Sequence, residues 1–330
     1  MPGGGFLHGF GAAGAIGVDL FFVISGFIMV TTTWKAFGTP GASKAFLTRR
    51  ILRIYPAYWA ALAVFLTIGI LFPLQQNVGP MTPASLITSA LLVPSHIPPL
   101  MFVAWSLEFE VYFYVVFAIA LHFSTSRIPA ILGIWFLATL ILSVAARATG
   151  LNIVQFLGSP LSFEFMGGGA IGYLLLHKHI FVPRTVLAAG ALIALGVAVY
   201  SSRFEGFGTL DLTWFRVLWA GPAMMLIVYG AAALEQRAHV EPPPILIAVG
   251  DASYTMYLWH GMMLGAYSAF FGHLHLHGRV GDAMFLAGAL LLVICGSLGL
   301  YRIVELPLTL SVKRLFRVER RPRPVTVSAP

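Results

Sequence analysis

Gly17-Val-Asp-Leu-Phe-Phe-Val-Ile-Ser-Gly-Phe27 is the stretch that decides the fold, because it opens the first long apolar run of the chain. It places two polar residues, Asp19 and Ser25, inside or beside that run. An Asp near the centre of a membrane helix costs about 2.5–3.5 kcal/mol, so Asp19 is a candidate functional residue. The alternative is a helix N-cap, in which the carboxylate accepts hydrogen bonds from free backbone N–H groups. The stretch alone leaves both interpretations open.

Composition places the chain among polytopic membrane proteins. Hydrophobic residues make up 58% of its 330 residues and charged residues only 10%, whereas soluble domains carry roughly 25% charged residues. The net charge of +8 fits loops that orient helices in a membrane better than a nucleic-acid patch, so we expect no nucleic-acid partner. The single cysteine, Cys295, excludes an internal disulfide.

The apolar runs predict an all-α, polytopic transmembrane bundle of about nine spanning helices, since a bilayer core of about 30 Å needs roughly 20 apolar residues per helix. The run 82–94 is shorter and bounded by prolines, which indicates a half-helix or re-entrant segment. We expect one integral membrane domain over 1–312 and a basic, disordered cytoplasmic tail over 313–330. The expected spans are residues 16–34, 55–73, 105–122, 128–146, 161–177, 184–200, 214–233, 253–272 and 282–304.

Basic residues in the loops orient these helices. The two strongest basic clusters are in the loop before residue 55 and in the C-terminal tail. An even number of expected helices separates them, so both clusters fall on one side, and the positive-inside bias makes that side cytoplasmic. The C-terminus is then expected inside and the N-terminal peptide outside.

A pair of arginines, Arg50 and Arg53, lies just before the second expected span. Being three residues apart, they share one face of a helix, and guanidinium pairs suit bidentate binding of phosphate. The alternative is a positive anchor followed by an aromatic belt at the membrane surface. Taken alone, the pair favours the anchor.

Two carboxylates, Glu108 and Glu110, stand at the entrance of the expected span 105–122. Tyr112 and Tyr114 lie four residues beyond them, so each Glu has a phenol one helical turn away. The alternative is an interfacial helix start, with Trp and Tyr at the level of the lipid headgroups. The pattern fits a functional site and an interfacial helix equally well.

Two later spans also carry polar residues. His260 lies in the otherwise apolar span 253–272, where a titratable group needs a cavity or a partner, although a lone helical His is more often a packing residue. Arg302 and Glu305 lie three apart at the end of the last span, so an ion pair at the helix end is expected.

Alternating histidines at 273, 275 and 277 would face one way on an extended segment, as a metal site requires. They fall in an expected outer loop, and the rest of the sequence offers no second cluster of His, Cys or acids to complete the coordination. We therefore expect no metal site.

Taken together, these motifs resemble the membrane-bound acyltransferase 3 family, which O-acylates cell-surface sugars, and in particular its exopolysaccharide O-acetyltransferase branch. The stretch Gly17–Phe27 contains the family's Gly-Val-Asp-x-Phe-Phe-Val-x-Ser-Gly-Phe element in full. The motifs are individually modest, but they occur in the family's order over nearly the whole chain. The other matching positions are Arg50, Arg53, Ile54 and Pro56, then Trp105, Ser106, Leu107, Glu110, Phe113 and Tyr114, then Ser253, Tyr254, Tyr257, Leu258 and His260, and finally Glu305 and Pro307.

The resemblance has one departure. Family members look like ten-helix proteins whose first helix starts in the cytoplasm and carries an Arg and the catalytic His. Here nine spans are expected, and His8 is the only histidine before Gly17, close to it and without a preceding apolar helix. Either the sequence begins after the family's first helix, or the chain is a degenerate member. The otherwise complete motifs favour the first interpretation.

The resemblance implies an acyl-CoA co-substrate, usually acetyl-CoA, without a bound cofactor, in a multi-pass protein of the bacterial cytoplasmic (inner) membrane. The implied acceptor is a glycan or a lipid-linked glycan, and the lipid bilayer is the surrounding partner. A general base must activate the acceptor hydroxyl, and a polar group must stabilise the oxyanion. The implied roles are catalysis for Asp19, Glu110 and His260, with His8 as a further candidate, acyl-donor binding for Arg50, Arg53 and Glu305, and substrate binding for Trp105, Tyr114 and Tyr254.

Two other classes of function stay open. A transporter or flippase would also be polytopic with polar residues inside the membrane, and it predicts two similar halves with interrupted helices. The sequence contains no such internal repeat. A catalytically inactive membrane scaffold is the third class, because the family's first-helix His is not found.

Overall fold

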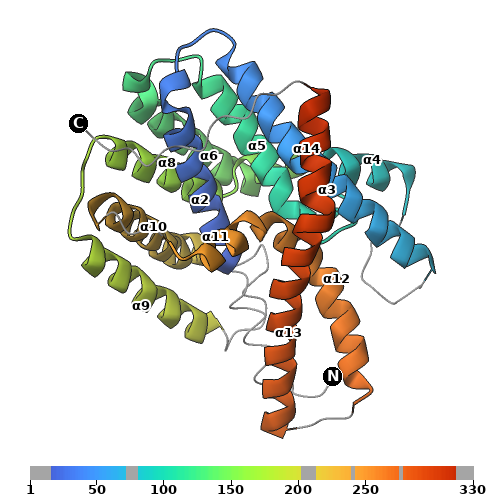
Figure 1. Cartoon of the computed structure of the whole chain (residues 1–330). Coiled ribbons are helices and arrows are strands. Elements are labelled where there is room, and N and C mark those ends of the chain that lie inside the picture. Colours follow the sequence, from blue (N-terminus) through green and yellow to red (C-terminus); the bar gives the residue numbers. More distant parts are fainter. Residues whose placement is uncertain (1–15, 72–80, 202–212, 239–241, 275–277, 317–330) are drawn as a thin grey trace. The chain divides into compact units, whose positions relative to one another are not determined.

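The computed structural model describes residues 16–71, 81–201, 213–238, 242–274 and 278–316 (Figure 1). All regular elements in these ranges are helical, which confirms the all-α fold class. The long helices are α2 (Ile16–Thr33), α3 (Ala42–Leu71), α5 (Ala104–Ala120), α6 (Ile128–Thr149), α8 (Ser162–Leu176), α9 (Pro183–Ser201), α10 (Thr213–Ala238), α12 (Ser253–Gly272) and α13 (Gly278–Leu300). The shorter elements are α4 (Pro83–Leu91), α7 (Asn152–Leu157), α11 (Pro244–Asp251), α14 (Leu306–Leu315), two 3-10 turns at Trp34–Ala36 and Thr125–Arg127, and a π-helical turn at Tyr301–Glu305.

Each expected span corresponds to one long helix. In the described ranges, six helical segments are long and apolar enough to cross a membrane, namely those that contain α2, α3, α6, α9, α10 and α13 with α14. The other expected spans form α5, α8 and α12, with 17, 15 and 20 residues. The polytopic membrane architecture predicted from composition is therefore confirmed.

Two helix boundaries refine the expectation. α3 begins at Ala42, well before residue 55, because Lys and Arg are good helix formers even where they interrupt an apolar run. The short run after residue 81 forms α4, whose start is capped by the Thr82 hydroxyl accepting from the Ser85 N–H at 3.1 Å. α4 ends at Leu92 in the left-handed conformation, with φ at 52°. The run is thus a short, well-capped helix, as expected for a half-helix.

The described chain divides into two compact units. Unit 1 comprises residues 1–43, 78–243 and 275–284, and unit 2 comprises residues 44–77, 244–274 and 285–330. Unit 1 therefore holds α2 and α4 to α10, whereas unit 2 holds α11, α12, α14 and most of α3 and α13. Of the expected basic tail, residues 313–315 belong to α14, and residues 317–330 lie outside the described ranges.

Glycines let α2 and α8 approach closely within unit 1. A methyl group added to Gly26 would collide with the Phe165 carbonyl oxygen, and one added to Gly168 would collide with the Val23 carbonyl oxygen. Close backbone approach at small residues is a main source of packing energy between membrane helices. This contact fixes the position of the stretch Gly17–Phe27.

Four helices of unit 1 run in broadly the same direction. Val23 of α2 faces Gly168 of α8, and Phe27 faces Gly172, so these two helices are parallel. The order of contacts likewise makes α5 parallel to α2 and α10 parallel to α8, whereas α6 and α9 are antiparallel to their neighbours. The N-terminal ends of α2, α5, α8 and α10 therefore lie on one side of unit 1, as alternating membrane crossings require.

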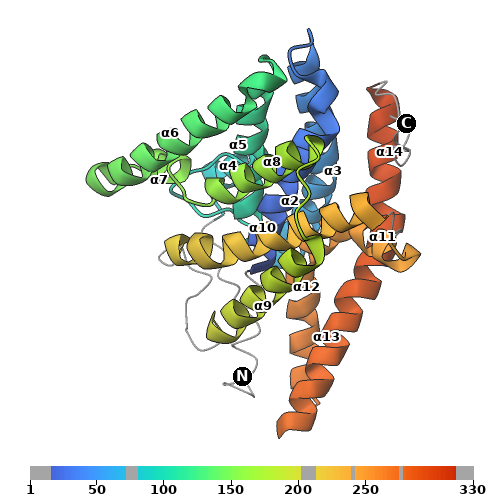
Figure 2. The ribbon, with the colours of Figure 1, turned by 90° about the vertical axis from the view of Figure 1, so that its left-hand side faces the viewer.

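Unit 2 contains one long, nearly continuous helical rod. α13 passes through the π-helical turn into α14 without an intervening loop, as Figures 1 and 2 show. α12 is tied to α3 by the Tyr254 hydroxyl, which donates to the Ile54 carbonyl at 2.9 Å. It also contacts α13, where the rings of Tyr267 and Phe285 have centroids 5.2 Å apart. The π-helical turn carries Glu305 at its last position, and such turns are frequent at functional sites.

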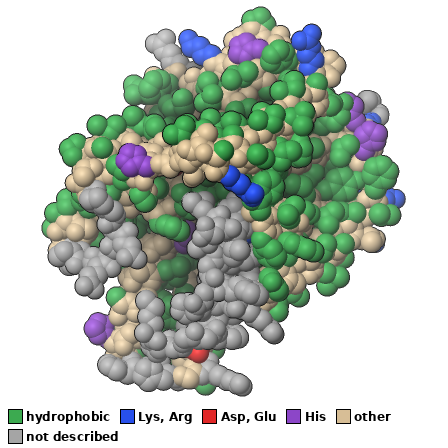
Figure 3. Space-filling model, turned by 180° about the vertical axis from the view of Figure 1, so that it is seen from behind, with side chains coloured by type: hydrophobic (Ala, Val, Ile, Leu, Met, Phe, Trp, Pro, Cys, Tyr) green, Lys and Arg blue, Asp and Glu red, His purple; other side chains and the backbone are tan. Residues whose placement is uncertain are grey.

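The surface of the long helices is largely apolar. Figure 3 shows a face on which hydrophobic side chains predominate and Lys and Arg are few. Ile134, Leu192 and Leu218 are each more than half exposed, at 69%, 70% and 62%. Lipid chains can cover such side chains in a bilayer, whereas in water they would form an unusually large apolar patch.

Candidate active site

The N-terminal ends of α2 and α10 hold a buried ion pair. Asp19 lies in the first turn of α2 with 0% of its surface exposed, and Arg216 lies near the start of α10 with 3% exposed. The Arg216 Nη2 donates to the Asp19 Oδ2 at 2.9 Å. Asp19 is thus inside the helix rather than at its N-cap, and its carboxylate is bound by a cation from another helix. This geometry supports the functional interpretation of Asp19 over the capping one.

A second carboxyl group, Glu164, completes the cluster. Glu164 lies in the first turn of α8, is fully buried, and stands beside both Asp19 and Arg216. Its side chain lies against Gly221 of α10, where an added methyl group would meet the Glu164 Oε1 at 3.3 Å. Three helices therefore bring two carboxyl groups and one guanidinium together in the interior, and we call these three residues the Asp19 cluster.

Glu110 lies beside Ser25 of α2, further along that helix than Asp19. It is 3% exposed in α5, and it accepts a hydrogen bond from the Ser25 hydroxyl of α2 at 3.1 Å. Both polar residues of the opening stretch, Asp19 and Ser25, thus point into the unit and engage charged side chains. Sequence spacing did not reveal the Ser25 partner, because the two residues are 85 positions apart.

Aromatic side chains surround this region of α5. The Trp105 ring meets the Phe22 ring edge to face with centroids 6.4 Å apart, and Tyr114 is buried. The Tyr112 hydroxyl, expected to serve the carboxylate one turn back, instead accepts from the Trp135 Nε1 of α6 at 3.0 Å. The expected pairing with Glu108 is wrong because Trp135 of the neighbouring helix supplies an N–H donor to the Tyr112 hydroxyl, whereas Glu108 on the same helix is a carboxyl acceptor.

Glu305 is the predicted site carboxylate of unit 2. The expected ion pair with Arg302 is wrong: the Thr255 hydroxyl of α12 donates to the Glu305 Oε2 instead, and Arg302 is exposed. The Arg53 guanidinium is close enough to act electrostatically on the Glu305 carboxylate. The π-helical turn changes the angular spacing of residues 301–305, so the three-residue interval no longer places Arg302 and Glu305 on one face.

Arg50 and Arg53 both lie within α3, three residues apart. Arg50 is half-buried, and its guanidinium lies 5.4 Å from the centre of the Phe46 ring. Arg53 is exposed. Within unit 2, Arg53 lies near Glu305; both are predicted to bind the acyl donor.

The remaining predicted site residues have simpler surroundings. The buried Tyr254 uses its hydroxyl to bind the Ile54 carbonyl. The His260 Nδ1 lies 2.8 Å from the Tyr257 carbonyl of its own helix. His8, and two histidines of the alternating set, at 275 and 277, lie outside the described ranges.

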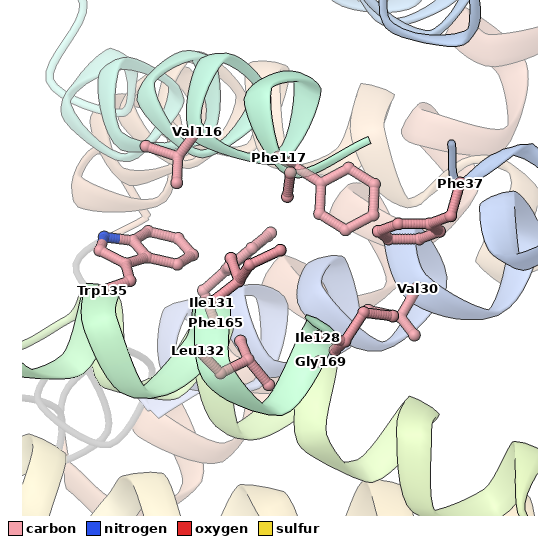
Figure 4. A pocket seen from close by; sticks show the side chains of 11 residues that line it. Val30, Phe37, Val116, Phe117, Ile128, Ile131, Leu132, Trp135, Phe165 and Gly169 are labelled. Atoms are coloured by element: carbon pink, nitrogen blue, oxygen red, sulfur yellow. The ribbon is translucent and has the colours of Figure 1, made fainter. Parts of the chain in front are cut away.

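Unit 1 also contains an apolar cavity between α2, α5, α6 and α8 (Figure 4). The side chains around it are aliphatic or aromatic, among them Val30, Phe37, Phe117, Trp135 and Phe165. Among the described residues, no charged group lines the cavity, so its lining does not suit a phosphate or a sugar.

Sequence reasoning missed three residues of these sites: Glu164, Arg216 and Thr255. Glu164 and Arg216 each lie inside an expected span, 161–177 and 214–233. The argument that singled out Asp19, the cost of a charge in an apolar helix, applies equally to both and would have found them. Thr255 gives no such signal, because a helical Thr normally binds its own backbone.

The fold and the buried charges define a class: a polytopic membrane protein whose helices hold carboxylates and arginines in the interior. Within that class, the chain belongs to the acyltransferase 3 family, since the family model described as "Acyltransferase domain" matches residues 2–302. It is therefore a multi-pass membrane acyltransferase.

Curated relatives support this assignment. The chain is 34% identical to the exopolysaccharide production protein ExoZ of Rhizobium meliloti (strain 1021), over 75% of each chain. It is 26% identical to the putative membrane-bound transacylase BcsY of Komagataeibacter xylinus, over 91% of this chain and 78% of that one. It is 28% identical to the acyltransferase MdmB of Streptomyces mycarofaciens, over 96% and 86%. No solved structure matches the chain significantly.

Proposed function

We propose that this membrane acyltransferase moves an acyl group, in the simplest case acetyl, from acyl-CoA to a hydroxyl of a cell-surface or exopolysaccharide sugar. The observation that carries the proposal is the buried ion pair between Arg216 and Asp19, which belongs to the stretch Gly17–Phe27. Similarity to a protein named for exopolysaccharide production supports a glycan acceptor. No cofactor is needed, because acyl transfer from a thioester to an alcohol requires only proton transfer and oxyanion stabilisation.

Asp19 is the residue that we assign to base positioning. A hydroxyl attacks a thioester efficiently only when a base accepts its proton, and a base works best when a third group holds its orientation. Arg216 holds one Asp19 oxygen, Oδ2, which leaves Oδ1 available to a second partner. On this proposal Glu110, with Ser25, shapes the acceptor side, together with Trp105 and Tyr114.

Arg50 and Arg53 are the residues that we assign to the acyl donor. CoA carries phosphate groups, and guanidinium groups bind them by paired, charge-assisted hydrogen bonds. Arg53 is exposed and can meet a ligand, while the nearby Glu305 and Thr255 limit the directions that its side chain can take. The Tyr254 hydroxyl is already bonded to the backbone of α3, so we assign it to positioning α3 rather than to direct contact with substrate.

The proposed location is the bacterial cytoplasmic membrane, with the C-terminus inside. The basic clusters of α3 and of the C-terminal segment then face the cytoplasm, where acyl-CoA is available. The N-terminal ends of α2, α5, α8 and α10, with the Asp19 cluster, face the outer half of the bilayer, where a glycan or lipid-linked glycan arrives. The lipid bilayer covers the apolar faces.

Radiolabelled acetyl transfer in membranes tests this function. Membranes of cells that produce the protein are supplied with labelled acetyl-CoA, and O-acetylation of the surface polysaccharide is measured. Asp19→Asn should lower the rate by about tenfold or more, because the group that orients the base loses its charge. Asp251→Asn, the same change at an exposed carboxylate, is the matched control. Equal transfer by folded wild type and Asp19→Asn would refute the role of Asp19.

A further inference from the structure

Three carboxyl oxygens of the Asp19 cluster lack a hydrogen-bond donor. Within the described ranges, neither the Asp19 Oδ1 nor the two Glu164 oxygens accept a bond from any N–H or O–H group, although all three are buried. An unsatisfied buried acceptor normally costs free energy, and it calls for a partner that the side chains around it do not supply. Figures 1 and 2 show the three helices that enclose these atoms, α2, α8 and α10, packed together.

The charges of the cluster do not balance if both acids are ionised. Among the described residues, Asp19 and Glu164 would carry two negative charges against the positive charge of Arg216, and all three side chains are buried. An uncompensated buried charge is far more costly than a neutral acid, so such sites take up a proton instead. One proton makes the cluster neutral and also provides an O–H donor for one of the buried acceptors.

We propose that Glu164 is a neutral carboxylic acid that donates its O–H to the Asp19 carboxylate and so fixes Asp19 for acyl transfer. The two side chains are close neighbours, as such a bond requires. Arg216 then binds Oδ2 of Asp19 from α10, and Glu164 binds the same carboxylate from α8. The inference rests on the proposed function for its catalytic consequence, but the protonation of Glu164 can be tested without it.

The charged groups on the packed elements are consistent with this assignment. α8 contacts α2, α10 and α6. Among the described residues, the charged groups that face Glu164 are Asp19 on α2 and Arg216 on α10. Arg147 of α6 is exposed in the last turn of that helix. Among the described residues, the cation beside Glu164 is Arg216, which also binds Asp19.

Glu164 is a positioning residue in this scheme, and it does not touch the substrate. A carboxylate held from two sides by Arg216 and Glu164 loses its rotational freedom, and a base oriented by it keeps one direction. Removing Glu164 should therefore reduce the turnover rate more than the apparent affinity for acetyl-CoA. Replacing it with a side chain that still donates should preserve both.

The activity test uses two variants of Glu164. Glu164→Gln keeps the shape and supplies an amide N–H donor, so acetyl transfer should stay within about twofold of wild type. Glu164→Ala removes the donor and should lower kcat by roughly tenfold or more, with the KM for acetyl-CoA unchanged. An inactive but folded Glu164→Gln, or a fully active Glu164→Ala, would overturn the positioning role.

Infrared spectroscopy tests the protonation directly. The purified full chain in detergent at neutral pH should show a protonated carboxyl C=O band that disappears in Glu164→Gln and shifts in D₂O. Asp251→Asn, the same kind of change at an exposed carboxyl group, should leave that band unchanged. If the Glu164→Gln difference spectrum shows the loss of an ionised carboxylate instead, the proposal is wrong, whether or not the acceptor glycan is correctly assigned.

Discussion

The two units hold their charged residues in different ways. In unit 1 the Asp19 cluster and Glu110 are buried, and every one of these groups is enclosed by packed helices. In unit 2 Arg53 is exposed, and Glu305 is half-buried beside Thr255. Buried groups that are fixed in advance suit chemistry, since they cost little reorganisation during reaction, whereas an exposed arginine suits the capture of a ligand that comes and goes.

The largest predicted effect comes from removing the cation of the Asp19 cluster. Arg216→Met leaves Asp19 buried and uncompensated, so the free energy of unfolding should fall by about 3–5 kcal/mol. Arg53→Met, at an exposed arginine of unit 2, should change the free energy of unfolding by less than about 0.5 kcal/mol. Thermal unfolding in detergent measures both, and Arg147→Met on α6 controls for loss of a positive charge.

A double variant sharpens the Arg216 prediction. Asp19→Asn together with Arg216→Met removes both members of the pair, so it should be more stable than Arg216→Met alone. If the double variant is less stable than the single one, the cost does not come from an uncompensated charge, and the buried ion pair does not explain the packing of α10 against α2.

Glycine substitutions probe the difference in packing. Gly168→Ala should destabilise unit 1 by about 1–3 kcal/mol, because the new methyl group meets the Val23 carbonyl oxygen in a rigid helix contact. Gly265→Ala in α12 of unit 2 has open space around it, so it should be neutral or slightly stabilising through helix propensity. Thermal unfolding again reports the result. Similar losses for both variants would show that the α2–α8 contact is not specially tight.

Arg53 should separate donor binding from catalysis. Arg53→Ala should raise the KM for acetyl-CoA by about tenfold while kcat changes little, because a charge-assisted phosphate contact is lost. Asp19→Asn should instead lower kcat while the KM for acetyl-CoA changes little. Arg302→Ala, at another exposed arginine, is the matched control for charge. An unchanged KM in Arg53→Ala would remove that residue from the donor site.

Much of the fold was predictable because apolar run length directly reports helices that cross a bilayer. The helix boundaries were less predictable. α3 extends back to Ala42 because basic residues interrupt the apolar run but have high helix propensity. The site was predictable only in part. Asp19 stood out as a carboxylate in a costly place, but its partner Arg216 lies 197 positions away, and no sequence spacing links them.

The failed Arg302 prediction shows a different limit. Spacing rules assume a regular α-helix, and the π-helical turn from Tyr301 to Glu305 departs from that geometry. Nothing in the local sequence marks the turn, and the hydroxyl that binds Glu305 comes from α12. Tertiary contacts therefore decide the partner of Glu305, and single-sequence reasoning cannot supply them.

The smallest predicted effect concerns that contact. Thr255→Val removes the hydroxyl that donates to Glu305 while keeping the side-chain shape, so the free energy of unfolding should fall by about 1 kcal/mol. Thr67→Val is the matched control, because the exposed Thr67 hydroxyl bonds only the Ala63 carbonyl of its own helix. If Glu305 limits the reach of Arg53, Thr255→Val should also raise the KM for acetyl-CoA by about twofold. A loss of stability without any change in KM would assign Thr255 and Glu305 to the packing of unit 2 alone, and leave donor binding to the arginines.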